Sequence, residues 1–298
     1  MTFDALAAGP EDGEPVLLLH GFPQTSYSFR TELLALGEAG YHAVAVDQRG
    51  YSPDARPSEP GAYAMGELVG DVVAIADALG APRFHLVGHD WGGAVAWVVA
   101  TRFPQRVRTL TVLSTPHFLA LGRSVATQGS EQAQRSSYFT DFAAPDAAER
   151  FLEDDMALFR ELMANAPIAA ADLEVYRERL SSLAAMRAAL NWYRTSAPRP
   201  APAGSAATGG GSPAPPPTTP NIPPIGVPTL YLWGTEDGAF ARATAEATAE
   251  FVTGPYAFHA LEGVGHWIPE QASDTVIRLL LEHFDGDDLT RSPLRGNV

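Results

Sequence analysis

The sequence contains no cysteine, and its basic residues are far outnumbered by its acidic ones. Its 298 residues include 20 Lys and Arg against 35 Asp and Glu, which gives a formal net charge of −15. Without cysteine the chain has no disulfide framework and no thiol chemistry. The acidic balance argues against nucleic acid or an anionic membrane as a partner, and mildly against small anionic substrates.

Long hydrophobic runs are missing as well. No uninterrupted apolar run approaches the roughly 20 residues that a membrane span requires. The first residues, Met1–Ala5, show neither the basic segment nor the apolar segment of a secretory signal. We therefore expect a cytoplasmic protein that has no membrane partner. Hydrophobic residues make up 46% of the chain, which is enough for a sizeable core in one large α/β domain or two small ones.

Short apolar runs alternate with longer amphipathic stretches in the first and last parts of the chain. This alternation predicts an α/β fold, in which helices cover both faces of a mostly parallel sheet. Residues 2–7 could form an edge strand. The other expected strands are Val16–Leu19, Ala43–Val46, Phe84–Val87, Thr109–Leu113, Thr229–Trp233 and Ala257–Leu261. The expected helices lie near Tyr27–Glu38, Met65–Leu79, Gly92–Arg102, Ala241–Phe251 and Thr275–Phe284.

The strand pattern stops in the middle of the chain. Residues 117–196 carry an Ala-, Leu- and Glu-rich helical pattern, as in Asp146–Met163 and Asp172–Leu190, which is broken by Pro145 and Pro167. We interpret residues 117–196 as a helical cap, or lid, inserted into an α/β core that is formed by residues 1–116 and 226–298.

The segment between the cap and the second part of the core has a different composition. Residues 197–225 are dominated by Pro, Gly, Ala, Ser and Thr, and include Gly209–Gly211 and Pro215–Pro217. Such a composition cannot bury enough apolar area to offset its chain entropy. We expect a flexible return loop here and assign no function to it.

The sequence Gly88-His89-Asp90-Trp91-Gly92 follows a short apolar strand and precedes an amphipathic helix. A nucleophile flanked at this spacing by small residues is the pattern of a nucleophile elbow, whose strand-to-helix turn is too tight for flanking side chains. Asp90 stands where a lipase or esterase has serine. Serine suits attack on acyl carbon, whereas a carboxylate attacks sp³ carbon by displacement and leaves an alkyl ester on the enzyme. The residue type therefore favours epoxide opening or halide removal.

Two backbone N–H groups are expected to face Asp90. His20-Gly21-Phe22-Pro23 directly follows the strand Val16–Leu19. In this architecture the loop at that place supplies one N–H group of an oxyanion hole, and the residue after the nucleophile supplies the other. The predicted donors are therefore the N–H groups of Phe22 and Trp91, while His20 itself is expected to be structural.

A general base and its acid partner are expected after the last two strands. His266 lies in the Gly-flanked sequence Gly263–Trp267, and the chain order of nucleophile, acid and histidine separates it from the other histidines. Asp237 lies earlier, after the strand Thr229–Trp233. Its carboxylate can accept the imidazole N–H and fix the tautomer, with Glu236 as the alternative.

The chain resembles the α/β-hydrolase superfamily, and within it the epoxide hydrolases. The resemblance covers the predicted core nearly end to end and implies the α/β-hydrolase fold, with Asp90, Asp237 and His266 as the catalytic triad. It implies neither a metal nor an organic cofactor, and no cluster of metal ligands is visible in the sequence. The motifs that match in type and order are His20–Pro23, Asp47–Ser52, Gly88–Gly93 and Gly263–Trp267.

In the cap, the resemblance implies two tyrosines that hold and protonate the epoxide oxygen. Tyr193 lies in the sequence Asn191-Trp192-Tyr193-Arg194, which matches the family's motif. Tyr138 lies in Ser136–Phe139, whose surroundings match less closely, and Tyr176 is the spare candidate. The alternative interpretation is that these tyrosines only pack, with a buried ring and a hydroxyl in water.

The expected reaction is the hydrolysis of a neutral, hydrophobic epoxide to a vicinal diol, since the side chains expected to line the pocket, Phe22, Trp91 and Trp267, are apolar. One alternative is a haloalkane dehalogenase, which uses the same Asp nucleophile. Against it, Phe22 stands where that family often has a halide-binding Asn, and Trp192 is the only tryptophan of the cap. A second alternative is a ligand-binding member of the fold that has lost turnover. Neither the particular epoxide nor the oligomeric state is readable from the sequence.

Overall fold

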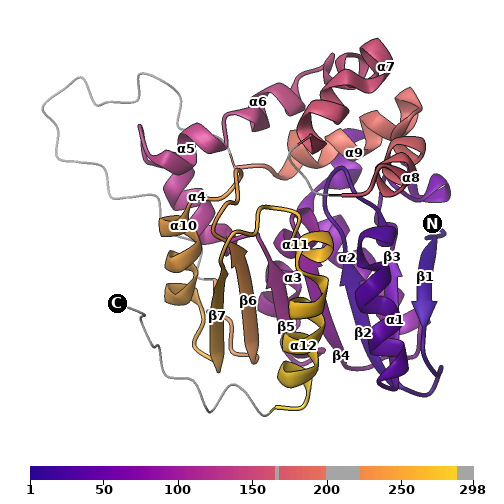
Figure 1. Ribbon diagram of the computed structural model, residues 1–298, viewed down its shortest axis with the longest axis vertical. Coiled ribbons are helices and arrows are strands. Elements are labelled where there is room, and N and C mark those ends of the chain that lie inside the picture. Colours follow the sequence, from indigo (N-terminus) through magenta and orange to yellow (C-terminus); the bar gives the residue numbers. More distant parts are fainter. Residues whose placement is uncertain (165–167, 199–221, 287–298) are drawn as a thin grey trace, which may run out of the picture.

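The computed structural model describes residues 1–164, 168–198 and 222–286. Its centre is a seven-stranded sheet in the order β1-β3-β2-β4-β5-β6-β7 (Figure 1). Neighbouring strands run parallel, except that β1 is antiparallel to β3. The predicted mostly parallel sheet is therefore confirmed. The strands are β1 (Ala5–Ala8), β2 (Glu14–Leu19), β3 (Tyr41–Val46), β4 (Phe84–His89), β5 (Val107–Leu113), β6 (Thr229–Gly234) and β7 (Tyr256–Leu261).

Helices cover both faces of the sheet, as predicted, and each face has its own core. Along β2 the side chains of Leu17 and Leu19 enter one core, and those of Val16 and Leu18 enter the other. Because both faces are buried, the central strands are continuous apolar runs rather than alternations of polar and apolar residues. The helices are α2 (Met65–Ala78) and α3 (Trp91–Arg102) in the first core, and α1 (Arg30–Glu38) and α12 (Ser273–Phe284) in the second.

Two of the predicted helices are partly 3₁₀ turns. The stretch at 27–38 begins as η1 (Ser26–Phe29) before α1, and the stretch at 241–251 is α10 (Arg242–Glu246) followed by η4 (Ala247–Phe251). Hydrophobic periodicity does not separate the two helix types over one or two turns. The remaining short elements of this part are η2 (Pro53–Ala55), η3 (Pro60–Tyr63) and α11 (Ile268–Gln271).

In the described residues, six helices lie between β5 and β6. The last four pack on one another over the end of the sheet at which the parallel strands finish, whereas the first contacts α10 and η4 (Figure 1). The helical pattern predicted at 172–190 covers two helices, because the Ser182 side chain caps a new helix by accepting from the Ala185 N–H. The six helices are α4 (Phe118–Ala126), α5 (Glu131–Arg135), α6 (Tyr138–Ala143), α7 (Ala147–Met163), α8 (Ala170–Leu180) and α9 (Leu183–Ser196).

The return from the cap to the core is only partly described. Most of the predicted flexible loop at 197–225, namely residues 199–221, lies outside the described residues, as does Pro167. Where the description resumes, Ile225 is fully buried and forms a parallel bridge with Val252. The chain has therefore joined the core by residue 225.

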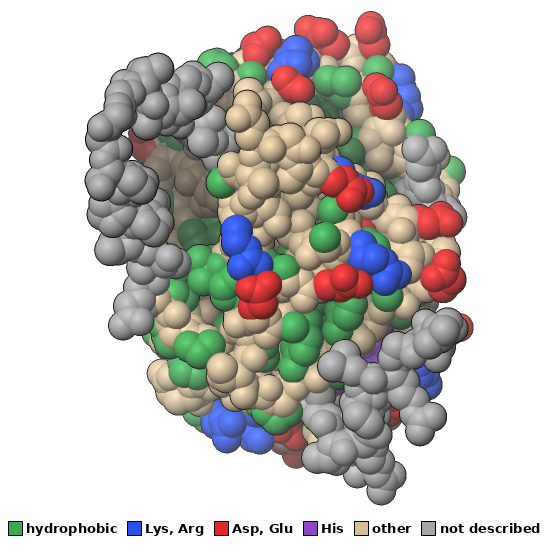
Figure 2. All heavy atoms as spheres, turned by 90° about the vertical axis from the view of Figure 1, so that its left-hand side faces the viewer, with side chains coloured by type: hydrophobic (Ala, Val, Ile, Leu, Met, Phe, Trp, Pro, Cys, Tyr) green, Lys and Arg blue, Asp and Glu red, His purple; other side chains and the backbone are tan. Residues whose placement is uncertain are grey.

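Charges of both signs are mixed on the surface. On the face in Figure 2, acidic and basic side chains lie side by side among hydrophobic and uncharged ones. Ion pairs such as Arg123–Glu250 and Arg242–Glu246 lie at exposed positions, where each contributes little to stability. Of the helices in residues 1–164, 168–198 and 222–286, none is both long enough and apolar enough to cross a bilayer.

Candidate active site

Asp90 sits at the tight turn between β4 and α3. Its φ of 51° and ψ of −119° lie in a region that side-chain-bearing residues rarely adopt. The flanking glycines are required by space: a Cβ on Gly88 would lie 2.4 Å from the Gly92 carbonyl oxygen, and one on Gly92 would lie 2.0 Å from the Leu19 carbonyl oxygen. The strained backbone and the missing side chains together match the predicted elbow.

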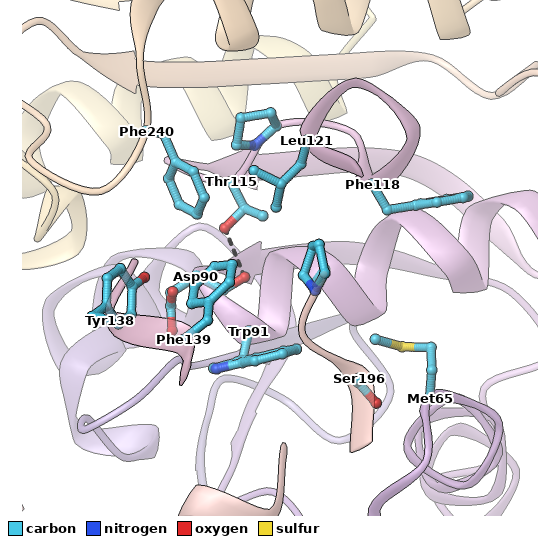
Figure 3. Close-up of a pocket in the computed structure, with 13 residues that line it drawn as sticks. Met65, Asp90, Trp91, Thr115, Phe118, Leu121, Tyr138, Phe139, Ser196 and Phe240 are labelled. Carbon is cyan, nitrogen blue, oxygen red and sulfur yellow. Dashed lines mark hydrogen bonds between the residues drawn. The ribbon is translucent and has the colours of Figure 1, made fainter. Parts of the chain in front are cut away.

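Backbone donors face the Asp90 carboxylate from two sides. The Phe22 N–H donates to Asp90 Oδ1 at 2.9 Å, and the Trp91 N–H also bonds this carboxylate. The Thr115 hydroxyl donates to the Asp90 carbonyl oxygen at 2.7 Å and so fixes the turn (Figure 3). Gly21 leaves room for the approach, since a Cβ there would lie 2.2 Å from Asp90 Cβ. The structure thus brings both predicted oxyanion-hole donors to the predicted nucleophile.

His266 lies between two carboxylates. Its Nδ1 is 3.0 Å from Asp237 Oδ2, and its Nε2 is 3.6 Å from Asp90 Oδ2. The other oxygen of Asp237 accepts the N–H groups of Ala239 and Phe240, so this carboxylate is held on both sides. The alternative acid, Glu236, lines a cavity instead.

Two of the three candidate tyrosines of the cap reach the cavity over Asp90. Tyr138 on α6 and Tyr193 on α9 both line it, and their ring centroids are 6.2 Å apart. The indole of Trp91 hydrogen-bonds the Tyr193 hydroxyl, and the two rings meet edge-on at 5.0 Å. The spare candidate, Tyr176, instead donates its hydroxyl to Glu270 at 2.8 Å.

Comparisons with known proteins identify the family of this chain. Residues 14–273 match the family model described as the alpha/beta hydrolase fold. The chain belongs to the α/β-hydrolase family. This α/β-hydrolase is 32% identical to Epoxide hydrolase A of Mycobacterium tuberculosis, over 94% of this chain and 93% of that one. It is 31% identical to the AB hydrolase superfamily protein YfhM of Bacillus subtilis, over 95% and 94%.

A solved structure has a similar backbone. It comes from work on epoxide hydrolases of the alpha/beta hydrolase superfamily in metagenomes from hot environments, and superposes with a TM-score of 0.82 at 29% identity, covering 95% of this chain and 94% of that chain. The resemblance that the sequence motifs indicated, to α/β-hydrolases and among them to epoxide hydrolases, is therefore confirmed.

Electrostatics keep the Asp90–His266 pair charged in this α/β-hydrolase. Burial opposes a charge on His266, but the negative charge and hydrogen bond of Asp237, helped by Asp90, raise its pKa to about 10. Burial likewise raises the pKa of Asp90, yet the hydrogen bond and charge of His266 outweigh it, so the net pKa is lowered. The Trp91 N–H contributes less to this lowering than His266 does.

Two cavities meet at Asp90 and Tyr138, which line both. The first has a volume of about 520 Å³, including its opening to solvent, and is mostly apolar (Figure 3). The second, about 1040 Å³, is more polar. Among other residues, Leu121, Phe118, Met65, Phe139 and Phe240 line the first, and Phe22, Tyr193, Trp267, Arg135 and Gln271 line the second. Phe22, Trp91 and Trp267, the predicted pocket residues, each line one of the two.

Two residues that support His266 have no predicted role in the sequence analysis. His89 Nε2 and the Ser114 hydroxyl donate to the His266 carbonyl oxygen at 2.8 and 2.7 Å. Burial, and then the charge of His266, lower the pKa of His89 to about 4, so its ring is neutral at neutral pH. Only their positions in the sequence could have indicated this role: His89 ends β4, directly before Asp90, and Ser114 directly follows β5. The described residues contain no group of three or more His, Asp or Glu that could hold a metal ion.

Proposed function

We propose that this α/β-hydrolase opens a neutral, hydrophobic epoxide to a vicinal diol through a covalent ester on Asp90. The proposal depends on one observation: an elbow carboxylate, not a serine, faces two cap tyrosines across a cavity, with His266 beside it. Relatives named epoxide hydrolases that match the chain nearly end to end support the same reaction.

In the first step, Asp90 attacks an epoxide carbon and the C–O bond of the ring breaks. The developing alkoxide is a poor leaving group at neutral pH, so it needs a proton donor. Burial raises the pKa of Tyr138 and of Tyr193 well above the ordinary value, which keeps both phenols protonated. The Tyr193 oxygen already accepts from the Trp91 indole, so its own proton can point to the substrate. The product of this step is a hydroxyalkyl ester of Asp90.

In the second step, water cleaves the ester. Esterification removes the negative charge of Asp90, which is one of the influences that raise the pKa of His266, so the imidazole can lose its proton and serve as a base. His266, oriented by Asp237, then takes a proton from water, and the hydroxide attacks the ester carbonyl. The N–H groups of Phe22 and Trp91 hold the oxyanion, and the diol leaves.

The indole N–H groups of Trp91 and Trp192 already have hydrogen-bond partners, so they are not free to bind a departing halide. A departing halide needs two N–H donors, but the Trp91 indole bonds Tyr193 and the Trp192 indole donates to the Arg49 carbonyl oxygen at 2.9 Å. Phe22, in addition, offers the site no side-chain donor. These contacts favour epoxide opening over haloalkane dehalogenation.

The decisive experiment supplies aryl and alkyl epoxides beside haloalkanes and scores diol and halide. We expect diol from the epoxides and no halide. The variant His266→Gln, incubated with the epoxide that the wild type consumes, should accumulate a heavier peptide that spans Asp90, as seen by mass spectrometry. A peptide that stays unmodified while the wild type forms diol would refute the covalent route. A protein that consumes none of these compounds would be a binding member of the fold.

A further inference from the structure

Three polar side chains that have no part in the proposed mechanism meet where two segments of the core contact one helix of the cap. Gln24 follows the loop of the Phe22 donor, Glu270 lies in α11 directly after the loop of His266, and Tyr176 lies in the cap helix α8. We refer to Gln24, Tyr176 and Glu270 as the Glu270 cluster.

One carboxyl oxygen of Glu270 holds the cluster together. Gln24 Nε2 donates to it at 2.5 Å, and the Tyr176 hydroxyl donates to it at 2.8 Å. Gln24 and Tyr176 are fully buried, so solvent does not compete for these hydrogen bonds. The bond between Gln24 and Glu270 joins residues 246 positions apart in the chain. The carboxyl group therefore connects two loops of the core and one helix of the cap at a single point.

Gln271, which follows Glu270 in the same short helix, secures the loop that carries His266. Gln271 Oε1 accepts the N–H of Gly265 at 2.7 Å, immediately before His266. Two consecutive side chains of α11 thus contact different segments. Gln271 holds the loop of His266, and Glu270 contacts Gln24, after the loop of Phe22, and Tyr176 of α8.

We propose that Glu270 is a positioning residue, which holds the loop of Phe22, the loop of His266 and helix α8 in the arrangement that hydrolysis of the Asp90 ester needs. The inference rests on the proposed function. In that step the Phe22 N–H and the His266 imidazole must meet the same ester carbonyl, although separate segments carry them. A displacement of about 1 Å between such groups can lower a rate by about a hundredfold.

The charges around Glu270 indicate that its ability to accept two hydrogen bonds matters more for the positioning role than its negative charge. From α1, Arg30 and Glu32 face it, and Arg30 already forms an ion pair with Asp172 of α8. Glu32 is fully buried and in turn feels Asp274 of α12. Burial raises the pKa of Glu270 to about 7, so the group is present in both forms at neutral pH, and either form can accept the two hydrogen bonds.

The test measures the two steps separately, with styrene oxide as the probe. In Glu270→Ala we expect ester hydrolysis to slow by about tenfold to a hundredfold while ester formation changes much less, so that the Asp90 ester accumulates during turnover. In Glu270→Gln, which keeps an acceptor oxygen of the same reach, hydrolysis should stay near the wild-type rate. Rapid-quench mass spectrometry of the Asp90 peptide measures both rates.

Asp172→Asn is the matched control. It neutralises the partner of Arg30 and so weakens a different link of α8 to the core, to Tyr27 and Arg30, without touching α11 or the loop of His266. If Glu270→Ala does not fold, Tyr176→Phe tests the same bond with the ring retained, and it should also slow hydrolysis of the ester.

Three outcomes separate the alternatives. Wild-type ester hydrolysis in a folded Glu270→Ala or in Tyr176→Phe would overturn the positioning role, as would an equal loss in Asp172→Asn. If His266→Gln never forms an ester with any epoxide, the proposed function fails. An ester in His266→Gln combined with unchanged hydrolysis in Glu270→Ala would reject only the role of Glu270.

Discussion

Asp90 and His266 set each other's pKa at the bottom of the cavity. Burial alone would favour the neutral form of both groups. Contact with each other, together with the carboxylate of Asp237, lowers the pKa of Asp90 and raises that of His266 to about 10. Below that pH the resting site therefore holds a carboxylate beside an imidazolium, and Asp90 is ionised without help from a substrate.

Neutralising either carboxylate should lower the pKa of His266. We expect the larger fall in Asp237→Asn, because the charge of Asp237 is the strongest of the influences that raise it, and a smaller fall in Asp90→Asn. The raised pKa means that His266 keeps its proton as the pH rises until about 10, so both variants should lose that proton at lower pH. An NMR titration of the imidazole across this range measures the effect. A His266 that titrates as in the wild type in both variants would contradict the triad.

The Tyr193 hydroxyl should matter mainly for ester formation. Removing it in Tyr193→Phe should slow formation of the Asp90 ester by about two to four powers of ten, because the alkoxide loses a proton donor. Tyr231→Phe is the control: this ring is equally buried, but its hydroxyl donates to the Ser114 carbonyl oxygen and not into the cavity. Single-turnover rates of ester formation decide the matter. Equal rates in the two variants would remove Tyr193 from the first step.

At the scale of elements, the elbow leaves no space between β4, α3 and the neighbouring strand. Gly92→Ala should lower the free energy of unfolding by about 1–3 kcal/mol or more, since the new Cβ would meet the Leu19 carbonyl oxygen. Gly70→Ala, at an exposed position of α2 with nothing nearby, should raise it by about 0.5–1 kcal/mol. Urea unfolding measures both. Equal effects would mean that the backbone around the elbow can relax.

The loops that carry the candidate site residues could be predicted from the sequence because each directly follows an apolar strand. Asp90, Phe22 and His266 all lie within a few residues of a strand end, and in parallel strands those ends share one edge of the sheet. Local pattern does not encode contacts between distant segments. The bond from the Ser114 hydroxyl to His266 spans 152 positions, and that from Gln24 to Glu270 spans 246.

The helices between β5 and β6 were predicted less completely than the sheet. The helical composition of residues 117–196 was evident, and so was the candidacy of Tyr193 through the family's motif. The predicted helical stretch at 172–190 runs across the break between α8 and α9, although a serine at the start of a helix, here Ser182, is a recognised capping signal. Which tyrosines face the cavity depends on how the helices pack, and the sequence alone left Tyr176 as a candidate although it faces Glu270.

At the scale of the whole molecule, the partly buried Glu270, which joins α8 to the core, should link stability to pH. The folded protein holds the proton of Glu270 up to a pH of about 7, whereas the unfolded chain loses it near the ordinary value of 4.5. Between these values the native state binds more protons, so the free energy of unfolding falls as the pH rises.

Glu270→Gln should remove this part of the pH dependence. Between acidic and slightly alkaline pH, the variant should lose less stability than the wild type, by up to about 3 kcal/mol. Urea denaturation at the two pH values gives the difference, and Glu246→Gln, an exposed substitution, serves as the control. Parallel curves for wild type and Glu270→Gln would show that the folded protein ionises this group as readily as the unfolded chain does.

The imidazolium of the resting enzyme also determines whether the reaction changes the pH of the surrounding solution. In the proposed reaction, the proton that a phenol gives up when the oxirane opens can be replaced from His266, and His266 regains one from the water that cleaves the ester. Every cycle then ends in the ionisation state in which it began, so an unbuffered assay with an indicator dye should stay neutral while epoxide disappears. Haloalkane hydrolysis would acidify the same solution by one equivalent for each molecule consumed, and the colour of the dye would tell the two chemistries apart.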